Sequence, residues 1–186
     1  AGFGVELLRS GRSVALEGGQ LLQATRVQVP GDFSSAAFFM VAASLAAGPG
    51  LTLRNVGVNP TRTGLLDMLI SMGADIRLHR HEGASPEPVA DIEIRPAALR
   101  GIRVPEALVP LAIDEFPVFF IAAACAEGET LVRGAEELRV KESDRLAVMA
   151  AGLAVLGVEH ELLPDGMWIR GRPGLGPAYG GGRIDS

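Results

Sequence analysis

The fold is decided by a stretch of sequence that occurs in two versions. Residues 114–132 read DEFPVFFIAAACAEGETLV, and residues 32–53 read DFSSAAFFMVAASLAAGPGLTL. Each version begins with aspartate, continues as a helical segment that is apolar nearly all round, reaches a glycine and ends in a short β-like run. A helix without a polar face is typical of a protein interior, and glycine favours a helix end. We therefore expect two buried helices, over residues 34–47 and 115–126, each followed by a strand.

The same order of elements continues after both stretches. An amphipathic helix is expected over residues 63–72 in the first copy and over residues 144–156 in the second, and a glycine follows each of them. Gly50 and Gly128, which precede the strands, are 78 residues apart. The pattern predicts repeated βαβαββ units of about 80 residues each.

Short runs with β-like composition lie between the helices. Each copy is expected to continue into a hairpin-like pair of strands, the second of which leads to the next aspartate and buried helix. Residues 26–30 lead into Asp32 in this way, and residues 102–104 lead into the segment before Asp114. The remaining strands are expected at Leu51–Val56, Asp75–Leu78, Ile92–Arg95, Thr130–Val132, Val158–Leu162 and Met167–Arg170.

The repeat suggests how the chain is divided. We expect residues 1–29 to be the end of a preceding lobe with its crossover, and residues 30–107 and 108–186 to be two βαβαββ units. A glycine-rich segment at residues 174–182 has the composition of a flexible connector, and the residues after it should lead into a third unit that the chain lacks. The predicted fold class is α/β, of the α+β type, forming an incomplete lobe.

The composition excludes several classes of protein. The 186 residues are 48% apolar, enough for a sizeable core, and carry a formal net charge of −5. This acidity, without basic runs among aromatic residues, argues against nucleic-acid binding. No signal peptide is visible in these residues, and no apolar run reaches the roughly 20 residues that a membrane helix needs. With one cysteine and therefore no internal disulfide, we expect a cytoplasmic protein.

The segment LRVKESDRL at residues 138–146 contains Lys141, the one lysine in a chain that otherwise uses arginine as its cation. Lysine is a compact point charge whose pKa the environment can move, unlike the guanidinium of arginine. Lys141, Glu142 and Arg145 lie at the start of a predicted helix, which adds partial positive charge. The arrangement favours a phosphate or carboxylate site with proton transfer nearby. The alternative is a solvated helix start in which the cations pair with Glu137 and Glu142.

The two aspartates that begin the buried helices have different surroundings. Asp114 follows an apolar approach, and it is either the N-cap of its helix or a carboxylate with a perturbed environment that acts as a base. Asp32 has no obvious cationic neighbour, so we expect a cap there. Ser34 and Ser35 are also expected to cap the first helix.

The loop at residues 59–63 occupies the place in the first unit that residues 138–144 occupy in the second. Arg62 and two threonine hydroxyls could bind an anion there, but a capped loop is the preferred interpretation. Cys125 lies in an apolar helical run and is expected in the core. The three histidines, at positions 79, 81 and 160, lack zinc-ligand spacing and are expected at the surface.

Several of these segments resemble the 5-enolpyruvylshikimate-3-phosphate synthase family, the 3-phosphoshikimate 1-carboxyvinyltransferases. The resemblance rests on residues 113–117 and 136–146, with support from 29–36 and 59–64, and spans nearly the whole chain. It implies a fold of two lobes, each of three βαβαββ units, in agreement with the repeat.

The resemblance also implies an activity and the roles of four residues. Members of the family transfer the enolpyruvyl group of phosphoenolpyruvate to the 5-hydroxyl of shikimate 3-phosphate, without metal or cofactor. Asp114 would hold the shikimate ring hydroxyls and favour deprotonation of the attacking one, and Lys141 would contact a shikimate hydroxyl or phosphoenolpyruvate. Glu142 would exchange the proton at the methylene carbon, and Arg145 would bind phosphoenolpyruvate. The other lobe of the same protein would be the partner.

Two alternatives remain open from the sequence. One is a UDP-N-acetylglucosamine enolpyruvyl transferase, which is similar in fold and chemistry, although the Lys-Glu-Ser-Asp-Arg run favours the shikimate enzyme. The other is a non-catalytic domain built from the same repeat. Because the family places further substrate-binding groups outside this stretch, we expect the chain to hold half of a cleft and to be inactive alone.

Overall fold

The computed structural model describes residues 2–81, 87–173 and 182–183. The chain begins with a hairpin and continues as two successive sets of helices and strands. In chain order the elements are β1 (Leu7–Ser10), β2 (Ser13–Leu16), α1 (Phe33–Leu45), β3 (Leu51–Gly57), α2 (Gly64–Ser71), β4 (Asp75–Arg80), β5 (Val89–Arg95), a 3₁₀ helix (Glu106–Leu111), α3 (Phe116–Cys125), β6 (Gly128–Val132), a second 3₁₀ helix (Glu136–Arg139), α4 (Arg145–Val155), β7 (Glu159–Leu163) and β8 (Gly166–Gly171).

The four helices and six strands expected from the sequence are all present, with ends that differ from the prediction by at most three residues. The strands form two antiparallel three-stranded sheets with the same topology, in the orders β3-β5-β4 and β6-β8-β7. In each sheet the last strand of the set lies in the middle, between the strand that follows the buried helix and the strand that follows the amphipathic helix. The glycine-rich segment predicted as a connector lies largely outside the described residues.

The runs that lead into the two buried helices, residues 26–30 and 102–104, do not form strands. The segments around them make isolated parallel bridges instead, between Gly31 and Val56, between Arg100 and Glu127, and between Arg103 and Leu131. The Gly31 N–H donates to the carbonyl of residue 55 at 2.7 Å. Its neighbour Pro30 has no N–H with which to extend the ladder. The expectation that strands lead into the two buried helices was therefore wrong, although both segments bridge to the neighbouring sheets.

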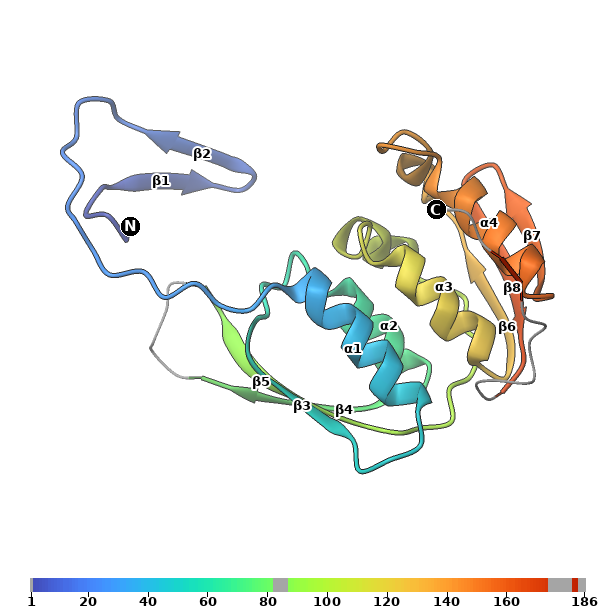
Figure 1. The fold of residues 1–186 in the computed structure, drawn as a ribbon. Helices are drawn as coiled ribbons and strands as arrows, with labels where there is room; N and C mark the ends of the chain where they lie inside the picture. The colour runs from blue at the N-terminus through green and yellow to red at the C-terminus, as the bar shows by residue number, and fades with distance from the viewer. Residues whose placement is uncertain (1, 82–86, 174–181, 184–186) are drawn as a thin grey trace.

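The helices lie between the two sheets, with α1 and α3 side by side (Figure 1). Alternation along the central strands fits this arrangement. Ile92 and Ile94 of β5 are fully buried, whereas Glu93 between them contacts charged partners on the other face. In β8 the buried residues are Met167 and Ile169. Each sheet therefore presents a period-2 apolar face to the helices and a polar face to solvent.

Helix α3 is the centre of the core. Its three phenylalanines are fully buried and pack against one another, with ring centroids 5.7–6.5 Å apart. Cys125 is buried at its end, as predicted. Helix α1 differs from the prediction, because Phe38 and Phe39 are 61% and 58% exposed although the helix is apolar all round. No element within the described residues covers that side of α1, so only its other side is buried.

The hairpin β1–β2 lies apart from the helices and is joined to α1 by an extended segment (Figure 1). All eight strand residues of the hairpin are exposed, including Leu8 and Leu16. No strand is predicted from sequence for residues 7–16. No helix within the described part of the chain is long and apolar enough to span a bilayer.

The crossing from the first unit to the second depends on a close backbone approach at Gly101. A Cβ placed there would lie 2.2 Å from the carbonyl oxygen of Glu129, which is a backbone atom of β6 that cannot move aside.

We expect Gly101→Ala to lower the free energy of unfolding by about 1–3 kcal/mol through overpacking, measured by urea denaturation. The control is Gly18→Ala, where a Cβ meets nothing within 4 Å; its effect should stay within about 0.5 kcal/mol. Equal stability of the two variants would contradict the close packing of the two units.

Candidate active site

Cations from both units surround the carboxylate of Asp114. Its Oδ1 lies 3.4 Å from Nη1 of Arg145 and 3.6 Å from Nζ of Lys141, and its Oδ2 lies 3.7 Å from Nη2 of Arg62. The carboxylate is 39% exposed, so the cluster is open to solvent. The structure thus brings Asp114 together with Lys141 and Arg145, as the sequence predicted, and adds Arg62 from the first unit.

Asp114 is not the N-cap of α3, contrary to one of the two interpretations from sequence. Helix α3 begins at Phe116, and Glu115 occupies the cap position without a side-chain cap hydrogen bond. An N-cap side chain normally accepts a hydrogen bond from the second or third N–H of the helix, and Pro117 at the second position has no N–H. The carboxylate of Asp114 is therefore free to face the cations.

Lys141 lies between the second 3₁₀ helix and α4. Its ammonium contacts Oε1 of Glu137 at 2.9 Å as well as Asp114. The hydrogen bond to Glu137 raises the pKa of Lys141, and the charge of Asp114 acts in the same direction against the opposing effect of desolvation. Lys141 is therefore held as a cation, suited to binding an anion or donating a hydrogen bond.

Glu142 reaches Asp114 through Arg145. Nη2 of Arg145 donates to Oε2 of Glu142 at 2.8 Å, while Nη1 of the same guanidinium faces Asp114. A hydrogen bond from its own backbone N–H and the bond from Arg145 lower the pKa of Glu142. Its side chain is 82% exposed, so Glu142 is an ionised carboxylate at the rim of the cluster. The ion pairs of the alternative interpretation are present, between Lys141 and Glu137 and between Arg145 and Glu142. Both cations also contact Asp114, so these pairs belong to one cluster.

The start of α4 is fixed by Asp144 and Arg139. Oδ1 of Asp144 accepts from the N–H of Ala147 at 3.0 Å, and its Oδ2 accepts from Arg139 at 2.6 Å. Arg139 also donates to the carbonyls of Leu163 and Pro164. The backbone hydrogen bond, followed by Arg139, lowers the pKa of Asp144 against desolvation. Asp144 and Arg139 thereby tie the segment between them, which includes Lys141 and Glu142, to the end of β7.

A second group of side chains lies behind the cluster. Glu115 is only 3% exposed, and its Oε1 accepts from Oγ of Ser34 at 2.5 Å and lies 3.9 Å from Nη2 of Arg62. Burial raises the pKa of Glu115, while the Ser34 hydrogen bond and the charge of Arg62 partly offset this. The sequence reasoning missed Glu115. The signal that could have found it is an acid placed between Ile113 and Phe116, where a buried helix begins.

One residue caps α1, and one of the predicted caps has another partner. Asp32 caps α1 as predicted, since its Oδ2 accepts from the N–H of Ser35 at 2.6 Å. The prediction that the Ser34 and Ser35 side chains cap this helix was wrong, because Asp32 already occupies the cap and the Ser34 hydroxyl turns to Glu115. In the loop before α2, Oδ1 of Asn59 accepts from the N–H of Thr61 at 3.0 Å. The loop is therefore capped internally, as preferred from sequence, and still presents Arg62 to the carboxylates.

The remaining titratable candidates lie elsewhere. His79 and His81 pair with Glu93 and Asp91 at 3.2 and 3.0 Å on the outer side of the first sheet, and His160 is part-buried on β7. Within the described residues no group of three His, Cys, Asp or Glu side chains could hold a metal ion. The cluster around Asp114 offers cations and carboxylates, which suit anionic substrates and proton transfer.

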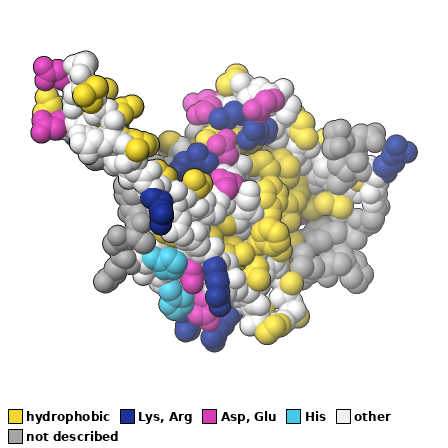
Figure 2. All heavy atoms as spheres, turned by 60° about the vertical axis from the view of Figure 1, so that its left-hand side comes forward, with side chains coloured by type: hydrophobic (Ala, Val, Ile, Leu, Met, Phe, Trp, Pro, Cys, Tyr) yellow, Lys and Arg dark blue, Asp and Glu magenta, His cyan; other side chains and the backbone are white. Residues whose placement is uncertain are grey.

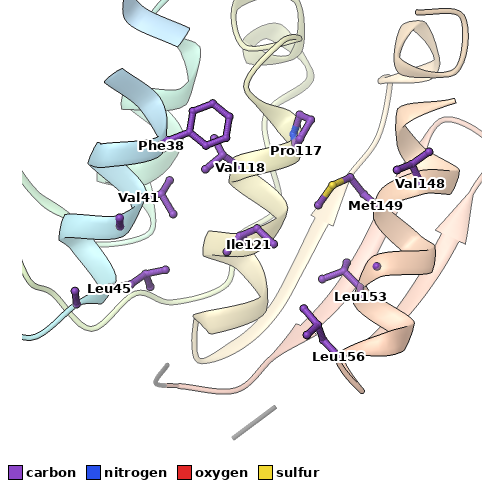
Figure 3. A pocket seen from close by; sticks show the side chains of 13 residues that line it. Phe38, Val41, Leu45, Pro117, Val118, Ile121, Val148, Met149, Leu153 and Leu156 are labelled. Carbon is purple, nitrogen blue, oxygen red and sulfur yellow. The ribbon is translucent and has the colours of Figure 1, made fainter. Parts of the chain in front are cut away.

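An apolar groove of about 600 Å³ separates α1, α3 and α4. Figure 3 shows side chains of all three helices pointing into it, among them Val41, Ile121 and Leu153. Figure 2 shows a band of hydrophobic side chains on one face of the molecule, below a group of acidic and basic side chains. The groove lacks charged lining residues, so it does not suit phosphorylated substrates, and the charged cluster remains the candidate site.

Comparison with known proteins agrees with the fold and identifies the family. A family model described as EPSP synthase (3-phosphoshikimate 1-carboxyvinyltransferase) matches residues 1–186. The chain belongs to the EPSP synthase family. It is 59% identical over 186 residues to the 3-phosphoshikimate 1-carboxyvinyltransferase of Alkalilimnicola ehrlichii and 60% identical over 185 residues to that of Halorhodospira halophila, covering all of this chain and 41% of each relative.

Solved structures give the same result. An EPSP synthase from Acinetobacter baumannii superposes with a TM-score of 0.93 at 50% identity, over 98% of this chain and 42% of that one. The enolpyruvyl transferase NikO from Streptomyces tendae, at 18% identity and a TM-score of 0.64, shares the fold. This EPSP synthase family chain therefore spans about two fifths of the length of the curated relatives it matches. The family match favours the shikimate enzyme over the UDP-N-acetylglucosamine enzyme considered from sequence.

The buried acid predicts a pH dependence of stability. Because burial raises the pKa of Glu115, the folded chain retains this proton to higher pH than the unfolded chain, whose value lies near 4.5. Ionisation of Glu115 therefore opposes folding increasingly as the pH rises above 4.5 through the raised pKa. Glu115→Gln keeps an oxygen that accepts from Ser34 and removes this ionisation.

We expect the stability of Glu115→Gln relative to the unsubstituted chain to increase between pH 4.5 and neutral pH, measured by urea unfolding at each pH. Glu17→Gln is the control, because it makes the same change at an exposed glutamate next to β2. A stability difference for Glu115→Gln that stays constant or decreases over this interval would show that burial does not raise the pKa of Glu115.

Proposed function

We propose that this chain supplies one side of the active site of a 3-phosphoshikimate 1-carboxyvinyltransferase, which transfers the enolpyruvyl group of phosphoenolpyruvate to the 5-hydroxyl of shikimate 3-phosphate and releases phosphate. The observation that carries the proposal is the placement of Asp114 against Lys141, Arg145 and Arg62. Membership in the family and the names of its full-length relatives support the choice of reaction.

The reaction needs a base at an oxygen and proton exchange at a carbon. In the addition step the 5-hydroxyl oxygen bonds to C2 of phosphoenolpyruvate as its proton leaves, and C3 gains a proton. In the elimination step C3 loses a proton and the C2–O bond to phosphate breaks. We assign the hydroxyl proton to Asp114, which accepts it, and the proton at C3 to Glu142. Glu142 must be protonated to give C3 its proton in the addition, and it takes that proton back from C3 in the elimination. General acid–base catalysis of this kind contributes about 10²–10⁴-fold to a rate.

The cations suit the negative charges of the substrates. Arg145 presents a guanidinium, which binds carboxylate or phosphate in a forked geometry, and we assign it to phosphoenolpyruvate. Lys141 presents a fixed ammonium beside Asp114, and we assign it to a shikimate hydroxyl or to phosphoenolpyruvate. The contacts of 3.4–3.7 Å around Asp114 are long, as is common in sites that tighten when substrate binds.

The magnitude of surface ion pairs supports a functional interpretation. Exposed pairs contribute about 0–1 kcal/mol each to stability, and Asp114 and Arg62 are 39% and 52% exposed. A cluster of cations around one exposed carboxylate therefore contributes little to the stability of the fold. It is well suited to receiving anions, because the charges are already in place before the substrate arrives.

The proposal includes the organisation of the whole protein. Residues 1–29, whose hairpin strands are fully exposed, would belong to a preceding lobe, and residues 30–107 and 108–186 would be two repeated units of the other. The rest of the protein would supply the remaining substrate contacts across the cleft. We expect it to act in the cytoplasm.

A hybrid enzyme tests the function. The matching segment of the Alkalilimnicola ehrlichii enzyme is replaced by residues 1–186, and release of phosphate from phosphoenolpyruvate and shikimate 3-phosphate is measured. We expect turnover, with kcat reduced about 10²–10⁴-fold by Asp114→Asn because the base is lost. The control is Arg77→Gln, which changes an exposed, ion-paired arginine on the far side of the first sheet and should leave kcat unaltered.

A hybrid that unfolds cooperatively but does not turn over would contradict the proposed function, as would full activity of the Asp114→Asn hybrid. If the hybrid does not fold, the 186-residue chain is titrated with phosphoenolpyruvate and followed by NMR. Selective shifts at Lys141 and Arg145 are then expected, and unchanged signals at millimolar ligand would count against the proposal.

A further inference from the structure

We propose that Arg62 is a positioning residue for Asp114, and that Ser34 and the buried Glu115 hold Arg62 in place. This inference rests on the proposed function, because it assigns a role in the same reaction to residues of the first unit. It concerns how the carboxylate of Asp114, in the second unit, is oriented.

The two oxygens of Asp114 have different partners. Oδ1 faces Lys141 and Arg145, both from the segment around the start of α4. Oδ2 lies 3.7 Å from Nη2 of Arg62, and within the described residues Arg62 is the cation that faces it. A carboxylate with cations on one oxygen only would be free to rotate toward them. Arg62 holds the second oxygen and so determines which oxygen is presented to a substrate hydroxyl.

The hydroxyl of Ser34 fixes the guanidinium of Arg62. Ser34 donates its hydrogen to Oε1 of Glu115 at 2.5 Å and accepts from Nη2 of Arg62 at 3.1 Å. A serine hydroxyl has one hydrogen to donate and lone pairs that accept. Because the hydrogen is committed to Glu115, a lone pair is directed at Arg62. The same Nη2 atom contacts Ser34 and Asp114, so fixing the nitrogen also fixes the contact with the carboxylate.

The burial of Glu115 supports its role in holding Arg62. It is 3% exposed at the start of a helix whose other buried residues are apolar, and burying a carboxyl group without partners is costly. Its partners come from the first turn of α1 and from the loop before α2, so the network joins elements of both units. An apolar residue would fill the site without this cost, but it would leave the Ser34 hydrogen and Arg62 unanchored.

A different role for Arg62 would be direct contact with a substrate anion, since its side chain is 52% exposed. The two roles predict different kinetics. Loss of a positioning residue misplaces the base and lowers kcat, whereas loss of a group that binds substrate equally throughout the reaction raises KM with kcat unchanged.

The test uses the active hybrid enzyme, so that failure of the proposed function appears separately as an inactive parent hybrid. We expect Arg62→Gln to lower kcat about ten- to a hundredfold, as displacement of a reacting group does, with little change in the KM for either substrate. Ser34→Ala should lower kcat less, and Ser34→Thr, which keeps the hydroxyl, should restore it. Because Ser34 acts through Arg62, adding Ser34→Ala to Arg62→Gln should have no further effect.

The inference is overturned if Arg62→Gln raises KM while kcat is unchanged, if kcat does not fall, or if the effects of the two substitutions multiply. Arg77→Gln is the matched control for removal of an exposed, ion-paired arginine. Urea unfolding of each variant separates loss of activity from loss of folded protein. Should Ser34→Ala not fold, the comparison of Arg62→Gln with the parent still decides between the roles.

Discussion

The carboxylate of Asp114 is the point on which the structure depends, because it is where the charges of two repeated units meet. It belongs to the residue next to the cap of α3, a helix in which most residues are buried, so its backbone is fixed by the core. Cations reach it from the loop before α2 and from the start of α4. The packing of α1 on α3 brings these loops together, and a shift between the units would separate the charges.

The repeat explains how a short chain can build such a site. Each unit places an apolar helix inside and an antiparallel sheet outside, so the loops at one end of the helices from both units come close together. Those loops differ in their chemistry. The first unit presents Arg62, while the second presents Lys141, Glu142 and Arg145. The two copies share a scaffold and divide the functional groups between them.

Local signals in the sequence predicted most of the fold and part of the site. The helices follow from apolar periodicity and terminal glycines, and Lys141 from its contrast with the arginines. The short bridges at Gly31 and Arg103 were not foreseen, because pattern alone does not reveal where a strand finds no partner. The contact between Ser34 and Glu115 joins residues 81 positions apart. Such a contact depends on how two units pack, which the local pattern around either residue does not contain.

The central claim is that one carboxylate is held by cations from both units, and it can be measured directly on the 186-residue chain. The ¹³C NMR signal of the Asp114 carboxyl carbon is compared in the unsubstituted chain and in Arg62→Gln, Arg145→Gln and Arg77→Gln. We predict that the signal moves with the first two substitutions, one from each unit, and stays in place with the third. A signal that responds to Arg145→Gln but not to Arg62→Gln would show that the first unit does not contact Asp114. This result would contradict the claim that cations of both units hold the carboxylate.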